Sequence, residues 1–118
     1  MMAADGYFIY TGGEVIPPGV TRVRIHESIT VIPAAAFRAN RKIEEVKCHD
    51  RVKTVEAGAF YECPSLRRVI MPGVRVVERW AFKYCEALTY VECDKLERIG
   101  QHAFAWCISL GSINLPSA

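Results

Sequence analysis

The features that the sequence lacks exclude several classes of protein. None of its 118 residues belongs to an apolar run that approaches the roughly 20 residues of a membrane-spanning helix. The opening stretch MMAADGYFIYTGG has neither the basic segment nor the long apolar segment of a secretory signal. We therefore expect a soluble chain and favour an intracellular location, while the organism and compartment stay open.

Neither sign of charge dominates. The chain has 15 Lys and Arg residues and 13 Asp and Glu residues, a formal net charge of +2. This balance gives no reason to expect nucleic acid or a membrane as a partner. A glycine-rich phosphate loop, a paired-carboxylate motif and a nucleophile elbow are also absent from the sequence. We expect a protein that is not an enzyme and that needs no cofactor or metal.

Five cysteines are an odd number, which disfavours a complete disulfide framework and suits a reducing compartment. Disulfides are not needed for stability either, because 51% of the residues are hydrophobic and a single domain of this length can bury a core.

What the sequence does contain is a repeat. Four Ala-Phe pairs end at Phe37, Phe60, Phe82 and Phe104, with spacings of 23, 22 and 22 residues. Self-similarity at such a period is typical of a solenoid. Three apolar columns accompany the pairs and predict one strand in each repeat: Val20, Ile43, Leu66, Leu88 and Leu110; Val23, Val46, Val69, Val91 and Ile113; and Ile25, Cys48, Met71, Cys93 and Leu115.

A second apolar pair follows each predicted strand, as at Val52 and Val55, and predicts a second short strand before a helical turn that carries the Phe. The one-residue difference in period lies in the connection between the two strands. This connection has three residues in early repeats, as in residues 49–51, and two in later ones, as in residues 72–73. Turn residues absorb an insertion there without moving the inward columns.

The repeated pattern L-x-x-V-x-L-P-x-x-V-x-x-I-x-x-x-A-F-x-x-C-x-x resembles the BspA-like class of leucine-rich repeats from Val20 to Pro116. The first copy departs from the pattern at Asn40, where later copies have cysteine, and at Pro33, where glycine is usual. The resemblance implies an α/β right-handed solenoid with short parallel strands on its concave side, and with second short strands and short helical turns on its convex side. It also implies a family of binding and adhesion modules without catalytic chemistry.

The domain boundaries follow from this reading. Residues 1–19 are predicted to form an N-terminal cap, with a β-hairpin of two short strands about the Gly12-Gly13 turn. The array then comprises residues 20–42, 43–65, 66–87, 88–109 and a partial fifth repeat, 110–118. Because this last strand has no polar cap, either the array continues or the open edge pairs with another copy of the chain.

Matching positions of stacked repeats form ladders, one of which contains Asn40, Cys63, Cys85 and Cys107. We interpret these as buried small side chains whose thiols lie near backbone carbonyls. A disulfide between neighbouring rungs is the alternative, whereas thiols in a straight line cannot converge on zinc. Cys48 and His49 point to opposite faces of a strand and form no catalytic dyad, and His26 with His49 is a weaker candidate metal pair beside the reading as exposed turn residues.

The outward residues of the strands are the candidate partner-binding residues. Arg22, Glu45 and Arg68 alternate in sign, which favours cross-strand pairing, whereas Arg24 beside Lys47 has no such compensation. A basic end followed by an acidic end would suit a protein or peptide of complementary charge. The two rows are Arg22, Glu45, Arg68, Tyr90 and Ser112, and Arg24, Lys47, Ile70, Glu92 and Asn114.

Three aromatic residues form a second candidate patch on the convex side. Trp80 and Tyr84 are four residues apart around the expected helical turn, and Tyr84 and Trp106 occupy the same position in successive repeats. The leading hypothesis is a protein- or peptide-binding module that uses the concave sheet. The alternatives are a self-associating structural array and a carbohydrate or surface adhesion module that uses these aromatics.

Overall fold

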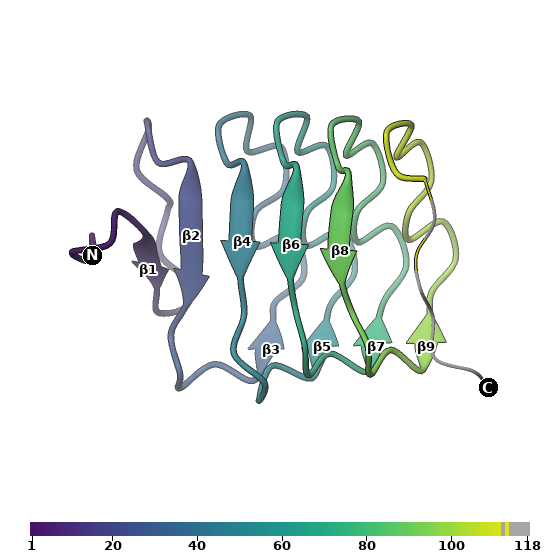
Figure 1. Cartoon of the computed structure of the whole chain (residues 1–118), viewed down its shortest axis with the longest axis horizontal. Coiled ribbons are helices and arrows are strands. Elements are labelled where there is room, and N and C mark those ends of the chain that lie inside the picture. Colours follow the sequence, from purple (N-terminus) through teal and green to yellow (C-terminus); the bar gives the residue numbers. More distant parts are fainter. Residues whose placement is uncertain (112, 114–118) are drawn as a thin grey trace.

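The computed structural model describes residues 1–111 and 113 and has nine short strands in two parallel sheets. Figure 1 shows the strands of one sheet in front of those of the other, with the chain winding from sheet to sheet in each repeat. The structure confirms the predicted parallel solenoid. The strands are β1 (Phe8–Tyr10), β2 (Arg22–Ile25), β3 (Val31–Ile32), β4 (Glu45–Lys47), β5 (Thr54–Val55), β6 (Arg68–Ile70), β7 (Val76–Val77), β8 (Tyr90–Glu92) and β9 (Arg98–Ile99).

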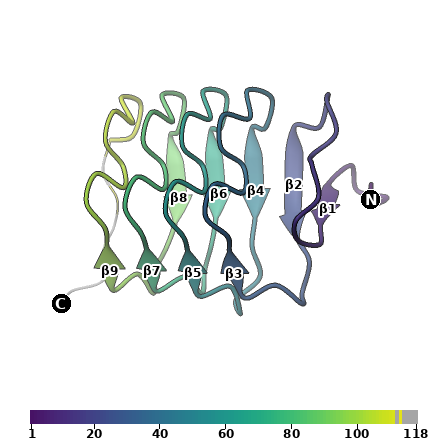
Figure 2. The same cartoon turned by 180° about the vertical axis from the view of Figure 1, so that it is seen from behind.

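The large sheet has the order β1-β2-β4-β6-β8 and the small sheet the order β3-β5-β7-β9. In the large sheet, Val23, Val46, Val69 and Val91 stand side by side, as the sequence columns predict. Figure 2 shows the small sheet from behind, where the second strand of each repeat pairs with that of the next. Register is therefore kept over both sheets because each inward column is buried.

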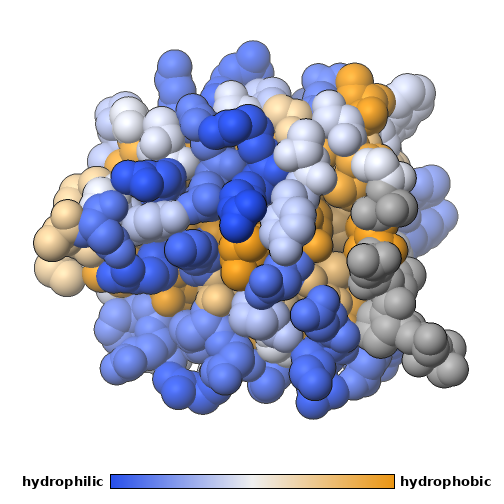
Figure 3. All heavy atoms as spheres, in the orientation of Figure 1, coloured by the Kyte–Doolittle hydropathy of each residue, from blue (hydrophilic) through white to orange (hydrophobic). Residues whose placement is uncertain are grey.

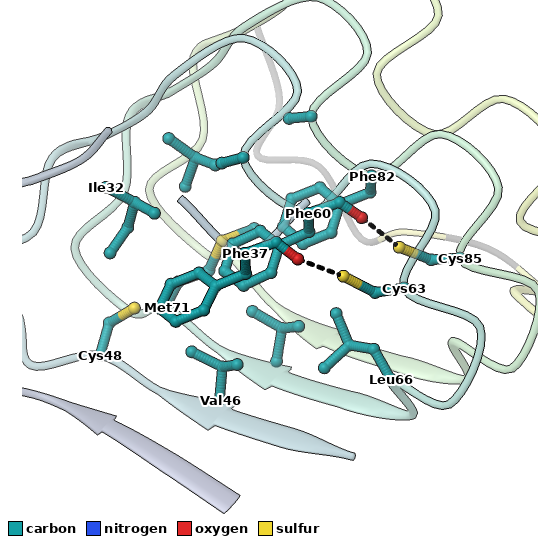
Figure 4. Close-up of a cluster of buried hydrophobic side chains, with 14 of the residues drawn as sticks. Ile32, Phe37, Val46, Cys48, Phe60, Cys63, Leu66, Met71, Phe82 and Cys85 are labelled. Atoms are coloured by element: carbon teal, nitrogen blue, oxygen red, sulfur yellow. Dashed lines mark hydrogen bonds between the residues drawn. The ribbon is translucent and has the colours of Figure 1, made fainter. Parts of the chain in front are cut away.

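The core lies between the sheets and is built around a column of aromatic rings. Phe37, Phe60, Phe82 and Phe104 stack with neighbouring ring centroids 4.9–5.1 Å apart and nearly parallel planes. Figure 4 shows three of these rings in line above the apolar residues of the strands. Tyr10 begins the column with its ring tilted by 56° against that of Phe37. One aromatic ring from each repeat thus fills the interior at a constant level.

The predicted helical turns are not confirmed, because the described residues contain no helix. In the first repeat, Ala36, Arg38 and Asn40 donate backbone hydrogen bonds to carbonyls three residues earlier, while Ala35 and Phe37 donate to the next repeat. In a helix, each N–H group after the first turn donates to the carbonyl four residues earlier in the same segment, so it is not available to a neighbouring repeat. These segments are therefore successive turns joined by a ladder of hydrogen bonds between repeats.

Left-handed backbone conformations make this alternation possible. Two residues in each turn segment have φ between 56° and 64°, where non-glycine residues pay a steric cost. The hydrogen bonds that these segments donate to the following repeat offset this steric cost. The residues are Ala35 and Ala39, Gly58 and Glu62, Trp80 and Tyr84, and His102 and Trp106.

A glycine accommodates the one-residue difference in period. A Cβ atom added to Gly73 would lie 1.9 Å from the carbonyl oxygen of Asp50, the central residue of a three-residue connection. Gly73 belongs to the first two-residue connection, so the longer connection of the preceding repeat occupies the space that a side chain would need. The connection between the two strands of a repeat therefore accommodates the extra residue, as predicted. It does so because Gly73 of the next repeat has no side chain at this point.

The hairpin predicted about Gly12 and Gly13 is not formed. The strand β1 pairs in parallel with β2, and residues 11–19 contain no strand. Glu14 closes the loop instead, because its carboxylate accepts hydrogen bonds from the backbone N–H of Thr11 and of Gly12, and the hydroxyl of Tyr10 accepts one from the N–H of Gly13. The inward ring of Tyr10 thereby becomes part of the core rather than of a hairpin.

The predicted last strand falls largely outside the described residues. Residues 112 and 114–118, which include Ser112 and Asn114 of the outward rows, are not described. The open-edge pairing predicted for residues 110–118 therefore stays a prediction. In the part of the chain that is described, no helix has the length and apolar character to cross a bilayer.

Candidate interaction surface

The outward side chains of the large sheet form two parallel rows, which we call the sheet face. Strand pairing brings all eight predicted residues together, and it adds Tyr7 and Ile9 at the N-terminal end of the rows. Tyr7 lies next to Arg22 because the following residue pairs with Val23. The first row is Tyr7, Arg22, Glu45, Arg68 and Tyr90, and the second is Ile9, Arg24, Lys47, Ile70 and Glu92.

The first row is held by polar contacts between neighbouring strands. Arg68 Nε lies 3.2 Å from Glu45 Oε2, and the guanidinium of Arg68 lies 4.8 Å from the ring centre of Tyr90. The hydroxyl of Tyr7 donates a hydrogen bond to the other carboxylate oxygen of Glu45. These contacts agree with the predicted alternation of charge and fix the side chains in place across the strands.

Residues 1–7 fold against the basic end of the sheet face. The carboxylate of Asp5 forms an ion pair with Arg24, and its backbone carbonyl accepts a 3.4 Å hydrogen bond from Arg22. The ring centre of Tyr7 lies 4.8 Å from the guanidinium of Arg22 and 5.2 Å from Lys47 Nζ. The expectation that Arg24 beside Lys47 has no compensation is therefore wrong, because Asp5 pairs with Arg24 and the ring of Tyr7 lies near both cations.

The second row borders a hollow of about 500 Å³ on the sheet face. Ile9, Ile25 and Ile70 give it an apolar lining, and Arg24 and Lys47 place two cations beside them. Figure 3 shows apolar surface between charged side chains over this sheet. Glu27 also lines the hollow, so its charge is positive on balance. An apolar wall with a net positive charge suits a ligand group that is apolar and acidic at once.

The two histidines beside this hollow are bound to the chain itself. His49 Nε2 donates a 3.0 Å hydrogen bond to the carbonyl of His26, and His49 Nδ1 accepts a 3.1 Å bond from the N–H of Arg51. His26 Nδ1 accepts a 3.1 Å bond from the N–H of Ser28. Both ring nitrogens of His49 are thus used, which excludes the weaker candidate, a metal bound by His26 and His49, in this arrangement. Residues 1–111 and 113 contain no cluster of three or more His, Cys, Asp or Glu side chains suited to a metal.

The cysteine ladder has the structure that the sequence predicts. The thiols of Cys63, Cys85 and Cys107 each donate a hydrogen bond of 3.0–3.1 Å to the carbonyl of a Phe in the preceding repeat, as Figure 4 shows for the first two. Asn40 accepts hydrogen bonds from the N–H groups of two following residues instead. All five thiols are free and buried.

The protonation of these thiols is set by their surroundings. Burial raises the pKa of Cys48 to about 12 and that of Cys107 to about 12. The neighbouring Cys63 thiol, together with burial, raises the pKa of Cys85. Neutral, inaccessible thiols cannot act as nucleophiles near neutral pH.

The aromatic patch differs from its predicted composition. Tyr84 stacks on Trp106 with ring centres 6.3 Å apart and meets Tyr61 edge-on at 5.8 Å. Trp80 instead lies beside the guanidinium of Arg79, at 5.7 Å. The predicted grouping of Trp80 with Tyr84 rested on a helical turn, which this segment does not form. Trp80 and Trp106 are 46% and 63% exposed.

The repeat geometry agrees with a family model. Residues 19–118 match the BspA type leucine rich repeat region with six copies. The chain belongs to this leucine-rich repeat family. Proteins of the family are generally binding or adhesion proteins and are typically not enzymes. No protein in the curated collection of known functions matches this chain.

Two crystal structures are similar to this leucine-rich repeat chain. One is a leucine-rich repeat protein from Bacteroides ovatus, with 32% identity and a TM-score of 0.73 over 83% of this chain and 26% of that one. The other is a leucine rich cell surface protein from Faecalibacterium prausnitzii, with 19% identity and a TM-score of 0.42 over 99% of this chain and 52% of that one. The chain thus spans about a quarter of the first protein and about half of the second.

Sequence reasoning missed Tyr7 and Ile9 of the sheet face, and Asp5, which forms an ion pair with it. The repeat pattern begins at Val20 and carries no information about strand β1. A signal was present in the apolar residues Phe8 and Tyr10, which alternate with Tyr7 and Ile9 as in a half-buried strand.

Proposed function

We propose that this leucine-rich repeat chain is a non-enzymatic module that binds a protein or peptide over the sheet face. One observation carries the proposal: the sheet face presents cations, two carboxylates, aliphatic groups and two aromatic rings in two ordered rows beside a hollow of about 500 Å³. Ile9 and Ile70 lie in the same row as Lys47, so a partner can make apolar and charged contacts side by side.

Contacts within the first row support the proposal. The ion pair between Arg68 and Glu45 and the contact of Arg68 with Tyr90 hold exposed groups in fixed positions. Tyr90 is 44% exposed although it is a large aromatic residue. Arginine and tyrosine are enriched among the residues that dominate binding energy, because they combine large contact area with directional polar groups.

The test is a selection from a displayed random peptide library on the immobilised chain. Peptides that bind the sheet face will lose affinity for the Arg68→Glu variant and for the Tyr90→Ala variant. The matched control is Arg98→Glu, which reverses an exposed arginine on β9 of the other sheet. Affinity is measured by fluorescence anisotropy with each selected peptide.

Selected peptides whose affinity is unchanged by Arg68→Glu and Tyr90→Ala would contradict the proposal, as would a library that yields no binder. Circular dichroism of every variant checks that the fold is retained. Salt dependence adds a second readout, because contacts with exposed charges weaken as ionic strength rises.

Exposed tryptophans favour one second candidate, binding of a carbohydrate. Trp106, with its ring stacked on Tyr84, and Trp80 leave broad aromatic surfaces accessible to solvent. Such rings could stack against sugars. A glycan array that gives signals abolished by Trp106→Ala would support this candidate, and a blank array would remove it.

A further inference from the structure

We propose that the hollow on the sheet face binds an extended peptide segment with an acidic side chain flanked by two apolar side chains, in the spacing apolar-x-acidic-x-apolar. The inference rests on the proposed function of the sheet face and specifies the chemistry of its partner. The juxtaposition that carries it is the row Ile9, Arg24, Lys47 and Ile70, in which two cations lie between two isoleucines.

The spacing of the row fits an extended chain that crosses the strands. Neighbouring strands are about 4.8 Å apart, so about 14 Å separate Ile9 from Ile70. An extended peptide rises about 3.3 Å per residue and directs alternate side chains to the same face, so residues one and five are about 13 Å apart. The third residue then lies between Arg24 and Lys47. A peptide of this pattern therefore places one group over each part of the row.

The chain already places one carboxylate on this row. Asp5 belongs to a segment outside the sheet, and its ion pair with Arg24 shows that a carboxylate approaching from outside fits here. Lys47 is exposed, and within residues 1–111 and 113 it takes part in no ion pair. Its ammonium nitrogen lies 5.2 Å from the ring centre of Tyr7. A second carboxylate would complete the pairing of this charge.

The isoleucines of the row determine the two apolar side chains of the proposed peptide. Ile9 and Ile70 are half-buried and line the hollow at its two sides, with Ile25 contributing to its lining between them. Covering them removes apolar surface from water, which supplies affinity that an exposed ion pair alone does not.

The experiment measures binding of designed peptides by isothermal titration calorimetry. The probe contains Leu-Thr-Asp-Thr-Leu between soluble flanks, where threonine favours the extended conformation. One control peptide has asparagine in place of aspartate, a second has serine in place of both leucines, and a third is shortened to Leu-Asp-Leu. Each control is expected to bind at least about fivefold more weakly than the probe.

Variants of the protein locate the contact. Lys47→Met is expected to weaken the probe about fivefold and to abolish the preference for aspartate over asparagine. Ile70→Ser is expected to weaken the probe while keeping that preference. Lys53→Met is the matched control, because Lys53 is also exposed but precedes strand β5 on the other side of the solenoid. Thermal unfolding shows that each variant is folded.

The outcomes separate this inference from the proposed function. If the probe binds no better than its asparagine or shortened version, the inference is overturned. The proposed function stands in that case if library peptides still depend on Arg68 and Tyr90. Binding of dodecanoate that depends on Lys47, without binding of the probe, would assign the hollow to a small amphipathic anion. Dimerisation that Lys47→Met abolishes would assign it to a second copy of the chain, and either result overturns the inference.

Discussion

The thiol of Cys85 donates a 3.1 Å hydrogen bond to the carbonyl oxygen of Phe60 in the preceding repeat. Cys85 is fully buried, and within the described residues Phe60 accepts no other hydrogen bond through this oxygen. The thiol of Cys85 therefore satisfies the backbone of a turn. Its contribution to folding can be measured.

Replacing Cys85 by alanine is expected to lower the free energy of unfolding by about 2 kcal/mol, because the change leaves a buried carbonyl unsatisfied and a small cavity. Urea denaturation followed by circular dichroism measures the loss. The control is Cys48→Ala, which also removes a buried thiol but breaks no hydrogen bond in the described structure, and about 1 kcal/mol is expected there. Equal losses for the two variants would show that the bond of Cys85 contributes nothing.

Stability is expected to fall as the pH rises above about 9. Burial raises the pKa of Cys48 to about 12 in the folded chain, whereas an exposed thiol titrates at about 8.5. The unfolded state therefore loses this proton first, so folding stability is complete below pH 8.5 and decreases between there and pH 12, by about 1.4 kcal/mol per pH unit for one thiol. Urea midpoints measured at several pH values give the slope.

The Cys48→Ala variant isolates the thiol from lysines and tyrosines that titrate in the same range. Its midpoint should decrease less steeply with pH than that of the unchanged chain. Parallel slopes would contradict the burial of a neutral thiol.

In the native chain, a thiol reagent at neutral pH should modify all five cysteines only as fast as the chain unfolds.

Substituting alanine for Gly73 is expected to lower the free energy of unfolding by about 3 kcal/mol, because the new Cβ would overlap the carbonyl of Asp50. Lys95 occupies the same position of the following connection and tolerates a side chain, so Lys95→Ala should change stability by less than about 0.5 kcal/mol. Thermal unfolding of the two variants compares them directly. A mild effect of Gly73→Ala would mean that the connection moves easily. If Gly73→Ala does lower stability, deleting Asp50 in that variant should restore part of the loss, because the carbonyl that the new Cβ overlaps is removed.

Replacing Asp5 by asparagine is expected to strengthen binding of the acidic probe peptide about twofold, because Arg24 loses its own carboxylate and the sheet face becomes more positive. Both partners of this pair are about half exposed, so stability should change by less than 1 kcal/mol. Glu97→Gln is the control, since it breaks a similarly exposed pair with Arg75 away from the sheet face. Anisotropy titrations that give unchanged or weaker binding for Asp5→Asn would argue against competition between Asp5 and the ligand.

The strands and the core could be predicted from the sequence because burial repeats with the period of the chain. Val46 and Val69 occupy the same inward position in successive repeats, so an apolar residue recurs there with the period of the sequence. The cysteine ladder followed from the same alignment, and the bonds from Cys63 and Cys107 confirm it.

The turns and the N-terminal contacts could not be predicted, for two physical reasons. Trp80 and Tyr84 have left-handed backbone conformations, which only glycine normally signals in a sequence, so the segment resembled a helix. Asp5 and Arg24 are separated by 19 residues, and their contact depends on a strand that lies outside the repeat. The charge of the sheet face was therefore misjudged at its basic end, although eight residues of its two rows were identified.

The backbone hydrogen bonds between successive turn segments all run in one direction along the solenoid. Phe37 donates to Ala59, Phe60 to Ala81 and Phe82 to Ala103, and their neighbours follow the same sense. Aligned peptide groups add their dipoles, as they do in a helix. The column of turn segments therefore has an electrical polarity along the axis of the solenoid, and one turn segment can stack on another only head to tail.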